Sequence, residues 1–127
     1  MPFRFAADFV LLVHLGFILF VILGGLLVVR WRALMLVHVP AVAWAVFVEA
    51  TGTICPLTFV ENSLRVAAGA SGYPGGFIEH YLLGVIYPEG LSRPMQYLLA
   101  LLVVAVNAAV YACLLRARHA QHRMQTR

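Results

Sequence analysis

The chain has 127 residues, of which 63% are hydrophobic and only 11% are charged, and its mean hydropathy is +0.92. A soluble domain of this length cannot bury so much apolar surface, so the composition indicates a single membrane domain. The net charge of +4 comes from nine arginines and no lysine against five acids, and four of these arginines lie in the last twelve residues. Because this basic charge is local, it argues against nucleic-acid binding, which needs basic residues across a folded surface.

Two apolar runs open the chain and predict two membrane-spanning helices. The first covers residues 9–29, and its length of about 21 residues is too great for the apolar part of a cleaved signal peptide. We therefore expect it to remain as a membrane anchor. Arg30 and Arg32 close this run on either side of Trp31, which pairs a charged stop with an interfacial indole. A second span is predicted over residues 33–54, after only a tight turn.

Residues 55–92 lack a long apolar run and predict a hairpin of two short helices. Thr58 and Glu61 have the spacing of a capping box, which predicts a helix that begins at Thr58 and continues to about Ala68. Residues 77–87 form the second short helix of the hairpin. Eleven helical residues rise only about 16 Å, too little to cross a hydrocarbon core of about 30 Å. This hairpin is therefore expected to lie at the membrane interface or to enter the membrane re-entrantly.

The last span is predicted over residues 93–115, with Ser92 as its N-cap and Pro94 in its first turn. Residues 116–127 are expected to form a disordered basic tail. Three spans place the two termini on opposite sides of the membrane, and the positive-inside rule assigns the arginine-rich side to the cytoplasm. The N-terminus and residues 55–92 then face outward. The predicted fold is thus an all-α integral membrane domain over residues 1–115, with three transmembrane helices and a cytoplasmic tail.

Glu49 is the side chain that departs most from an apolar membrane helix. Ionisable residues within a membrane span are costly and are functional candidates by default. His14 and Glu49 each lie about five residues from the outer end of their spans, so both are roughly 8 Å deep and are placed to meet. A carboxylate at that depth needs water or a cationic partner, or it must be protonated. His14 is the nearest candidate partner, and Arg65 and Arg93 are the alternatives.

The outward side carries further side chains of the kinds that bind transition metals or relay protons. The spacing of these residues matches no known metal motif, so neither a metal nor any other cofactor is identified, and no catalytic residue is predicted. The candidate polar site consists of His14, Glu49, Cys55, Glu61, Glu79 and His80.

A second polar level is predicted deeper in the membrane. His38 precedes Glu49 by eleven residues, and eleven steps around a helix end within about 20° of the starting direction, so both side chains lie on one face. Gly25 follows His14 by eleven residues and therefore lies on the same face of the first span as His14. Asn107 on the last span completes this level with His38. The simpler alternative is that these polar groups only hydrogen-bond between helices, each contributing on the order of 0.6 kcal/mol.

The middle of the chain contains a set of polar, glycine and proline motifs, together with His14 near the start. They are His14, Trp44, Glu49, Gly52, Cys55-Pro56-Leu57-Thr58, Glu61-Asn62, Arg65, the run Gly75-Gly76-Phe77-Ile78-Glu79-His80-Tyr81 and Ile86-Tyr87-Pro88. This set resembles the motifs of a small bacterial membrane family catalogued as domain of unknown function 2784. The resemblance covers roughly residues 5–115 and implies a bacterial inner-membrane protein, but it implies no activity, cofactor or catalytic residue.

Two hypotheses about function follow from these patterns. The first is an accessory or interaction protein of the cell envelope, with the lipid bilayer and other membrane subunits as partners and with a structural role for the polar residues. The second is a binding or redox module whose outer-leaflet site for a metal, quinone or proton is lined by His14, Glu49, Glu61 and His80. An enzyme is the least favoured class, because no nucleophile–base or phosphate-binding motif occurs.

Overall fold

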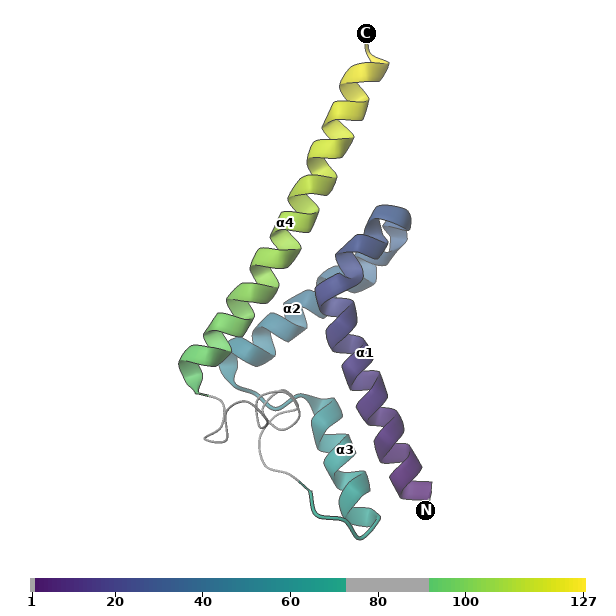
Figure 1. The fold of residues 1–127 in the computed structure, drawn as a ribbon, viewed down its shortest axis with the longest axis vertical. Helices are drawn as coiled ribbons and strands as arrows, with labels where there is room; N and C mark the ends of the chain where they lie inside the picture. Colours follow the sequence, from purple (N-terminus) through teal and green to yellow (C-terminus); the bar gives the residue numbers. More distant parts are fainter. Residues whose placement is uncertain (1, 73–91) are drawn as a thin grey trace.

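The computed structural model describes residues 2–72 and 92–127, and within them every regular element is helical. Figure 1 shows that α1 and α4 run in the same direction, that α2 returns between them, and that α3 lies beside the first half of α1. The all-α prediction is confirmed for this part of the chain. The elements are α1 (Pro2–Arg30), the 3₁₀ turn η1 (Arg32–Leu34), α2 (Met35–Thr51), α3 (Pro56–Ala67) and α4 (Arg93–Gln125).

Three helices are long and apolar enough to cross a membrane: Pro2–Arg30, Arg32–Thr51 and Arg93–Gln125. The second span ends at Thr51, earlier than predicted, because Gly52 takes the left-handed conformation with φ of 69° that commonly terminates a helix. The last helix is longer than predicted and continues to Gln125. The expectation of a disordered tail is therefore wrong. Residues 116–125 contain no glycine or proline and are rich in strong helix formers, so nothing in them stops the helix.

The helix α3 begins three residues earlier than the predicted capping box requires. Cys55 is its N-cap residue and Pro56 occupies the first turn, where the missing N–H of proline costs nothing. Thr58 is therefore inside the helix, and the capping-box interpretation is wrong. The predicted end near Ala68 agrees with the structure. The second predicted short helix, residues 77–87, lies outside the described residues.

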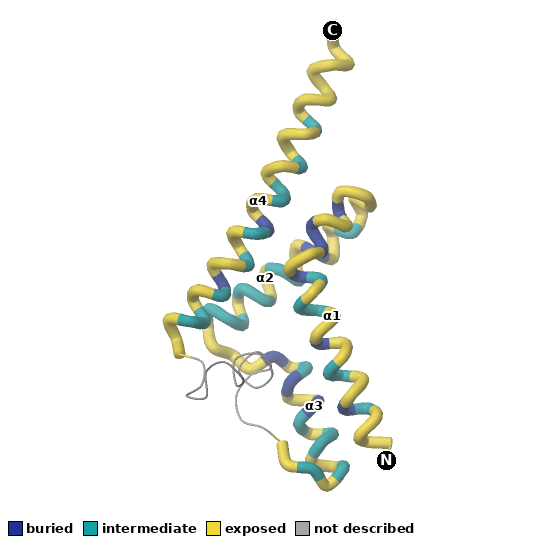
Figure 2. The backbone as a smooth tube through the Cα atoms, in the orientation of Figure 1, coloured by how far each residue is buried: buried dark blue, intermediate teal, exposed yellow. Residues whose placement is uncertain are grey.

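The buried face of α1 forms a single stripe with a seven-residue spacing, made by Ala7, His14, Val21 and Val28. Most other apolar side chains of α1 and α4 are exposed, as the yellow colouring of these helices shows in Figure 2, and those of α2 are exposed or partly exposed. The packed interior is thus narrow, and a lipid environment is the natural solvent for the remaining surface.

Two glycines let the helices approach closely at the centre of the bundle. A Cβ atom at Gly24 would lie 2.5 Å from Cδ2 of His38, and one at Gly25 would lie 2.9 Å from Cγ1 of Val110. Real Cβ contacts are not this short, so both positions need glycine for the observed packing. Small residues at such crossings are typical of membrane helix interfaces.

Candidate functional site

The half of the bundle nearer the α1–α2 turn contains a hydrogen-bonded cluster centred on His38, which is fully buried; we call this cluster the inner knot. Its Nδ1 lies 2.7 Å from the Tyr111 hydroxyl, and its Nε2 lies 3.4 Å from the Val21 carbonyl oxygen. The arrangement assigns the neutral tautomer, in which Tyr111 donates to Nδ1 and the Nε2–H donates to Val21. The ring of Phe20 packs edge-on against the imidazole, with centroids 5.1 Å apart.

Asn107 joins the same knot from α4. Its Nδ2 donates to the Val21 carbonyl at 3.0 Å and to the Val103 carbonyl of its own helix at 2.9 Å. The Val21 carbonyl thus accepts a hydrogen bond from His38 and another from Asn107. The structure therefore brings His38 and Asn107 to one level, as their positions in the spans suggested.

The role of Tyr111 as the partner of His38 was not foreseen from the sequence. Tyr111 follows Asn107 by four residues, so both side chains project from the same face of α4. This spacing was the available signal, but it does not say which residue of α2 lies opposite.

The half of the bundle nearer the N-terminus carries a second polar cluster, formed between α1 and α3, which we call the outer cluster. His14 is 4% exposed, and its Nδ1 lies 3.5 Å from the hydroxyl of Thr58, which is fully buried. Glu61 is also fully buried, and it acts electrostatically on the His14 ring. Two side chains from α1 and α3 thus share one enclosed polar environment with a carboxylate.

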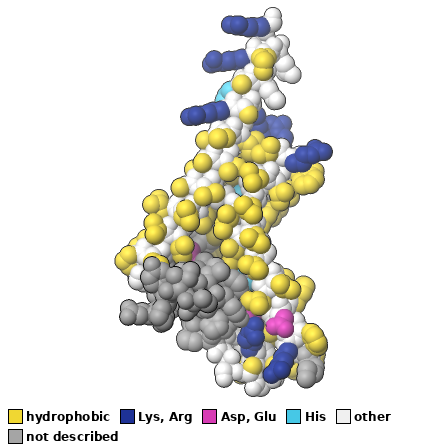
Figure 3. Space-filling view, in the orientation of Figure 1, with side chains coloured by type: hydrophobic (Ala, Val, Ile, Leu, Met, Phe, Trp, Pro, Cys, Tyr) yellow, Lys and Arg dark blue, Asp and Glu magenta, His cyan; other side chains and the backbone are white. Residues whose placement is uncertain are grey.

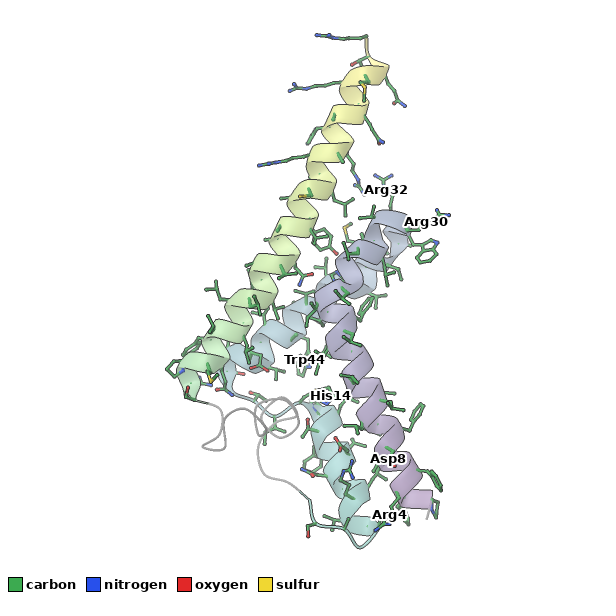
Figure 4. All side chains as sticks on the ribbon, viewed as in Figure 1. Arg4, Asp8, His14, Arg30, Arg32 and Trp44 are labelled. Carbon is green, nitrogen blue, oxygen red and sulfur yellow. The ribbon has the colours of Figure 1, made fainter. Side chains whose placement is uncertain are left out.

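Arg65 links this cluster to the surface. Its Nε donates to Oε1 of Glu61 at 2.8 Å, and its Nη2 lies 3.7 Å from a carboxylate oxygen of Asp8 on α1. Figure 4 shows Asp8 and His14 on the part of α1 that faces α3. The ion pair between Arg65 and Asp8 therefore connects α3 to the first half of α1. The buried carboxylate of Glu61 is neutralised by the guanidinium of Arg65.

The structure does not bring His14 and Glu49 together. His14 lies next to Thr58 and is influenced electrostatically by Glu61, and no hydrogen bond or ion pair between His14 and Glu49 occurs among the described residues. The reason is the position of α3, which packs on the face of α1 that carries His14, while α2 runs towards the start of α4 (Figure 1). Oε2 of Glu49 is buried and has no hydrogen-bond partner within residues 2–72 and 92–127.

Arg93 was considered as a partner for Glu49, but it caps the end of α2 instead. Its guanidinium donates to the Ala50 carbonyl and to the Tyr97 hydroxyl, both at 3.1 Å, and to Oε1 of Gln96 at 2.9 Å. A cation at the C-terminus of a helix satisfies a free carbonyl and interacts favourably with the helix dipole. Gly52 leaves room for this group, since a Cβ there would collide with the guanidinium.

The remaining candidate residues are distributed as follows. Cys55 is buried at the start of α3, where its carbonyl accepts a hydrogen bond from the Thr58 backbone, and Cys113 is exposed on α4; both are free thiols. Glu79 and His80 lie outside the described residues. Among the residues that the structure does describe, no three His, Cys, Asp or Glu side chains form a group that could hold a metal ion.

The comparisons with known proteins agree with the membrane-family resemblance. A family model described as Protein of Unknown function (DUF2784) matches residues 4–112, which is most of the chain. No curated protein and no solved structure matches.

Proposed function

We propose that this chain, which belongs to the family described as Protein of Unknown function (DUF2784), is an accessory protein of the bacterial inner membrane that supports other membrane proteins rather than catalysing a reaction. In this proposal it spans the membrane three times, with the N-terminus and α3 outside and the end of α4 in the cytoplasm. Lipid and other membrane subunits are its partners.

The spacing of the charged residues supports insertion across a bilayer. The bond between Asn107 and Val21 sets α1 and α4 in register. Arg30 and Arg116 each lie nine residues beyond this bond, about 14 Å along their helices. Arg93 lies fourteen residues before it, or about 21 Å. The apolar band between the two charged levels is therefore about 35 Å, close to the thickness of a hydrocarbon core.

The observation that carries the accessory function is the use of the polar groups inside the bundle. His38 bonds through both ring nitrogens, and Asn107 bonds through its amide nitrogen to the backbone of α1. These side chains hold three helices together instead of lining an open polar cavity. The surface of α1 that faces the membrane in this proposal carries an apolar groove. The groove is lined by Gly16, Leu19, Phe20, Leu23, Gly24, Leu26 and Leu27.

Site-specific photo-crosslinking in native membranes tests this proposal. A photoreactive phenylalanine at Leu23, in the groove, is expected to give one discrete adduct whose partner is identified as a membrane protein by mass spectrometry. Leu101 on α4 is the matched control, because it is an equally apolar and exposed position outside the groove. Unmodified protein at both positions would contradict an accessory function.

A second candidate function is favoured by the outer cluster and by Glu49. The buried pair of Glu61 and His14 and the unpartnered oxygen of Glu49 support an outer-leaflet binding or redox site, to which His80 would contribute. Elemental analysis and a visible spectrum of protein purified from membranes are the test. A stoichiometric metal or a bound chromophore would favour this function over the accessory one, and a metal-free protein would remove the metal version of it.

A further inference from the structure

One end of the molecule carries several arginines that have no acidic neighbour among the residues that the structure describes. The three acids that the structure describes, Asp8, Glu49 and Glu61, all belong to the opposite half of the bundle, and residues 93–127 contain none. Figure 3 shows the basic side chains at the α1–α2 corner and along the free end of α4. Within residues 2–72 and 92–127, ion pairs involve only Arg65. Six arginines at this end therefore form no ion pair with any described residue: Arg30, Arg32, Arg116, Arg118, Arg123 and Arg127.

The two hydrogen bonds of the inner knot place arginines from different elements at one level. Counted from the bond between Val21 and Asn107, Arg30 and Arg116 are both nine residues away along parallel helices. Measured from the bond between His38 and Tyr111, Arg32 is six residues away and Arg116 is five. The first count puts Arg30 level with Arg116, and the second puts Arg32 within about 2 Å of Arg116.

This level coincides with the end of the apolar surface. The apolar run of α4 stops at Leu115, immediately before Arg116, and Trp31 is exposed between Arg30 and Arg32. The Arg30 guanidinium lies 5.9 Å from the centre of the Trp31 ring. Exposed tryptophan beside arginine is typical of the boundary between hydrocarbon and headgroups.

We propose that Arg30, Arg32, Arg116 and Arg118 form a docking surface for the phosphate groups of anionic phospholipids, and name these four residues the arginine belt. This inference rests on the membrane insertion proposed above. Guanidinium groups bind phosphate oxygens through paired hydrogen bonds, and anionic headgroups are the negative charges available at this depth.

The geometry also separates the belt from the end of α4. Arg123 lies seven residues beyond Arg116, about 10 Å further along the helix, and Arg127 lies further still. The headgroup layer extends only about 5–8 Å beyond the hydrocarbon core. Arg123 and Arg127 therefore stand past the lipid phosphates, although they carry the same charge on the same helix as Arg116 and Arg118.

The test is a lipid titration of the full chain, extracted in detergent from carbonate-washed membranes, with bound lipids counted by native mass spectrometry. Phosphatidylglycerol is expected to bind more tightly than phosphatidylcholine. An arginine near an anionic surface contributes about a fivefold gain in affinity, so the variant Arg116→Gln/Arg118→Gln should bind phosphatidylglycerol about 30-fold more weakly. Arg30→Gln/Arg32→Gln should show a similar loss from a different part of the chain.

Arg123→Gln/Arg127→Gln is the matched control, since it removes the same charge from the same helix and should change the affinity less than about twofold. Equal losses in the control and belt variants would overturn the proposal, as would equal affinity for the two lipids. Displacement of phosphatidylglycerol by excess inorganic phosphate would show a free-anion site and would also overturn it. A chain absent from carbonate-washed membranes would refute the insertion itself, whereas a membrane-embedded chain without lipid preference would refute only the belt.

Discussion

The substitution Gly24→Ala tests whether the inner knot fixes the packing of the three long helices. The added methyl group would lie 2.5 Å from Cδ2 and 2.9 Å from Nε2 of His38, and 3.0 Å from a ring carbon of Phe20. The imidazole cannot move aside without losing its bonds to Tyr111 and Val21. Overpacking costs about 1–3 kcal/mol, and the loss of one hydrogen bond costs about 1 kcal/mol more.

The helix propensity of alanine offsets about 1 kcal/mol of that cost, so the free energy of unfolding should fall by about 2 kcal/mol. Gly16→Ala is the matched control in the same helix, because a Cβ at Gly16 meets nothing within 4 Å. This control should leave stability unchanged or raise it slightly. Denaturant titration of both variants in detergent micelles, followed by circular dichroism, gives the two values. If Gly24→Ala is as stable as Gly16→Ala, the close approach of α1 and α2 at the knot is wrong.

Two further predictions use the same stability assay. Tyr111→Phe removes the donor to a buried imidazole and should cost about 1–3 kcal/mol, whereas Tyr97→Phe, which loses a bond at an exposed site, should change stability by less than about 0.5 kcal/mol; equal effects would count against the assigned knot. Glu61→Gln strands its arginine partner and should cost about 3 kcal/mol. In the double variant Glu61→Gln/His14→Gln, the loss of stability should differ from the sum of the two single losses by at least about 0.5 kcal/mol. In Glu49→Gln/His14→Gln the two losses should add. Non-additivity with Glu49 but not with Glu61 would show that Glu49, and not Glu61, is the partner of His14.

The inner polar level could be predicted because it follows from helix periodicity and depth alone. His38 and Asn107 sit at positions in their spans where a straight helix places them at a common level. The sequence also contains the close-packing glycine, Gly25, on the face that carries His14. The sequence does not show that the Val21 carbonyl accepts the hydrogen bonds of His38 and Asn107. This acceptor depends on the rotation of α1 about its own axis relative to α2 and α4.

The partner of His14 could not be predicted in the same way. Helix rise predicted that His14 and Glu49 lie at a similar depth, but depth alone does not say which helix packs against the His14 face of α1. The structure packs α3 on the His14 face, and Thr58 and Glu61 reach the imidazole from there. The three-residue spacing of Thr58 and Glu61 does place them on one face of a helix. Because the helix already starts at Pro56, both residues lie inside it and are buried, and neither caps its end.

The orientation of the chain in the membrane is the central claim, and labelling with a membrane-impermeant maleimide tests it most directly. Single cysteines at Ser63 on α3 and at Gln121 on α4, both exposed, are introduced after replacement of Cys55 and Cys113 by alanine. In intact cells Ser63→Cys should react, and Gln121→Cys should react only after the membrane is permeabilised. Labelling of Gln121→Cys in intact cells, or of neither position until permeabilisation, would contradict three spans with the N-terminus outside.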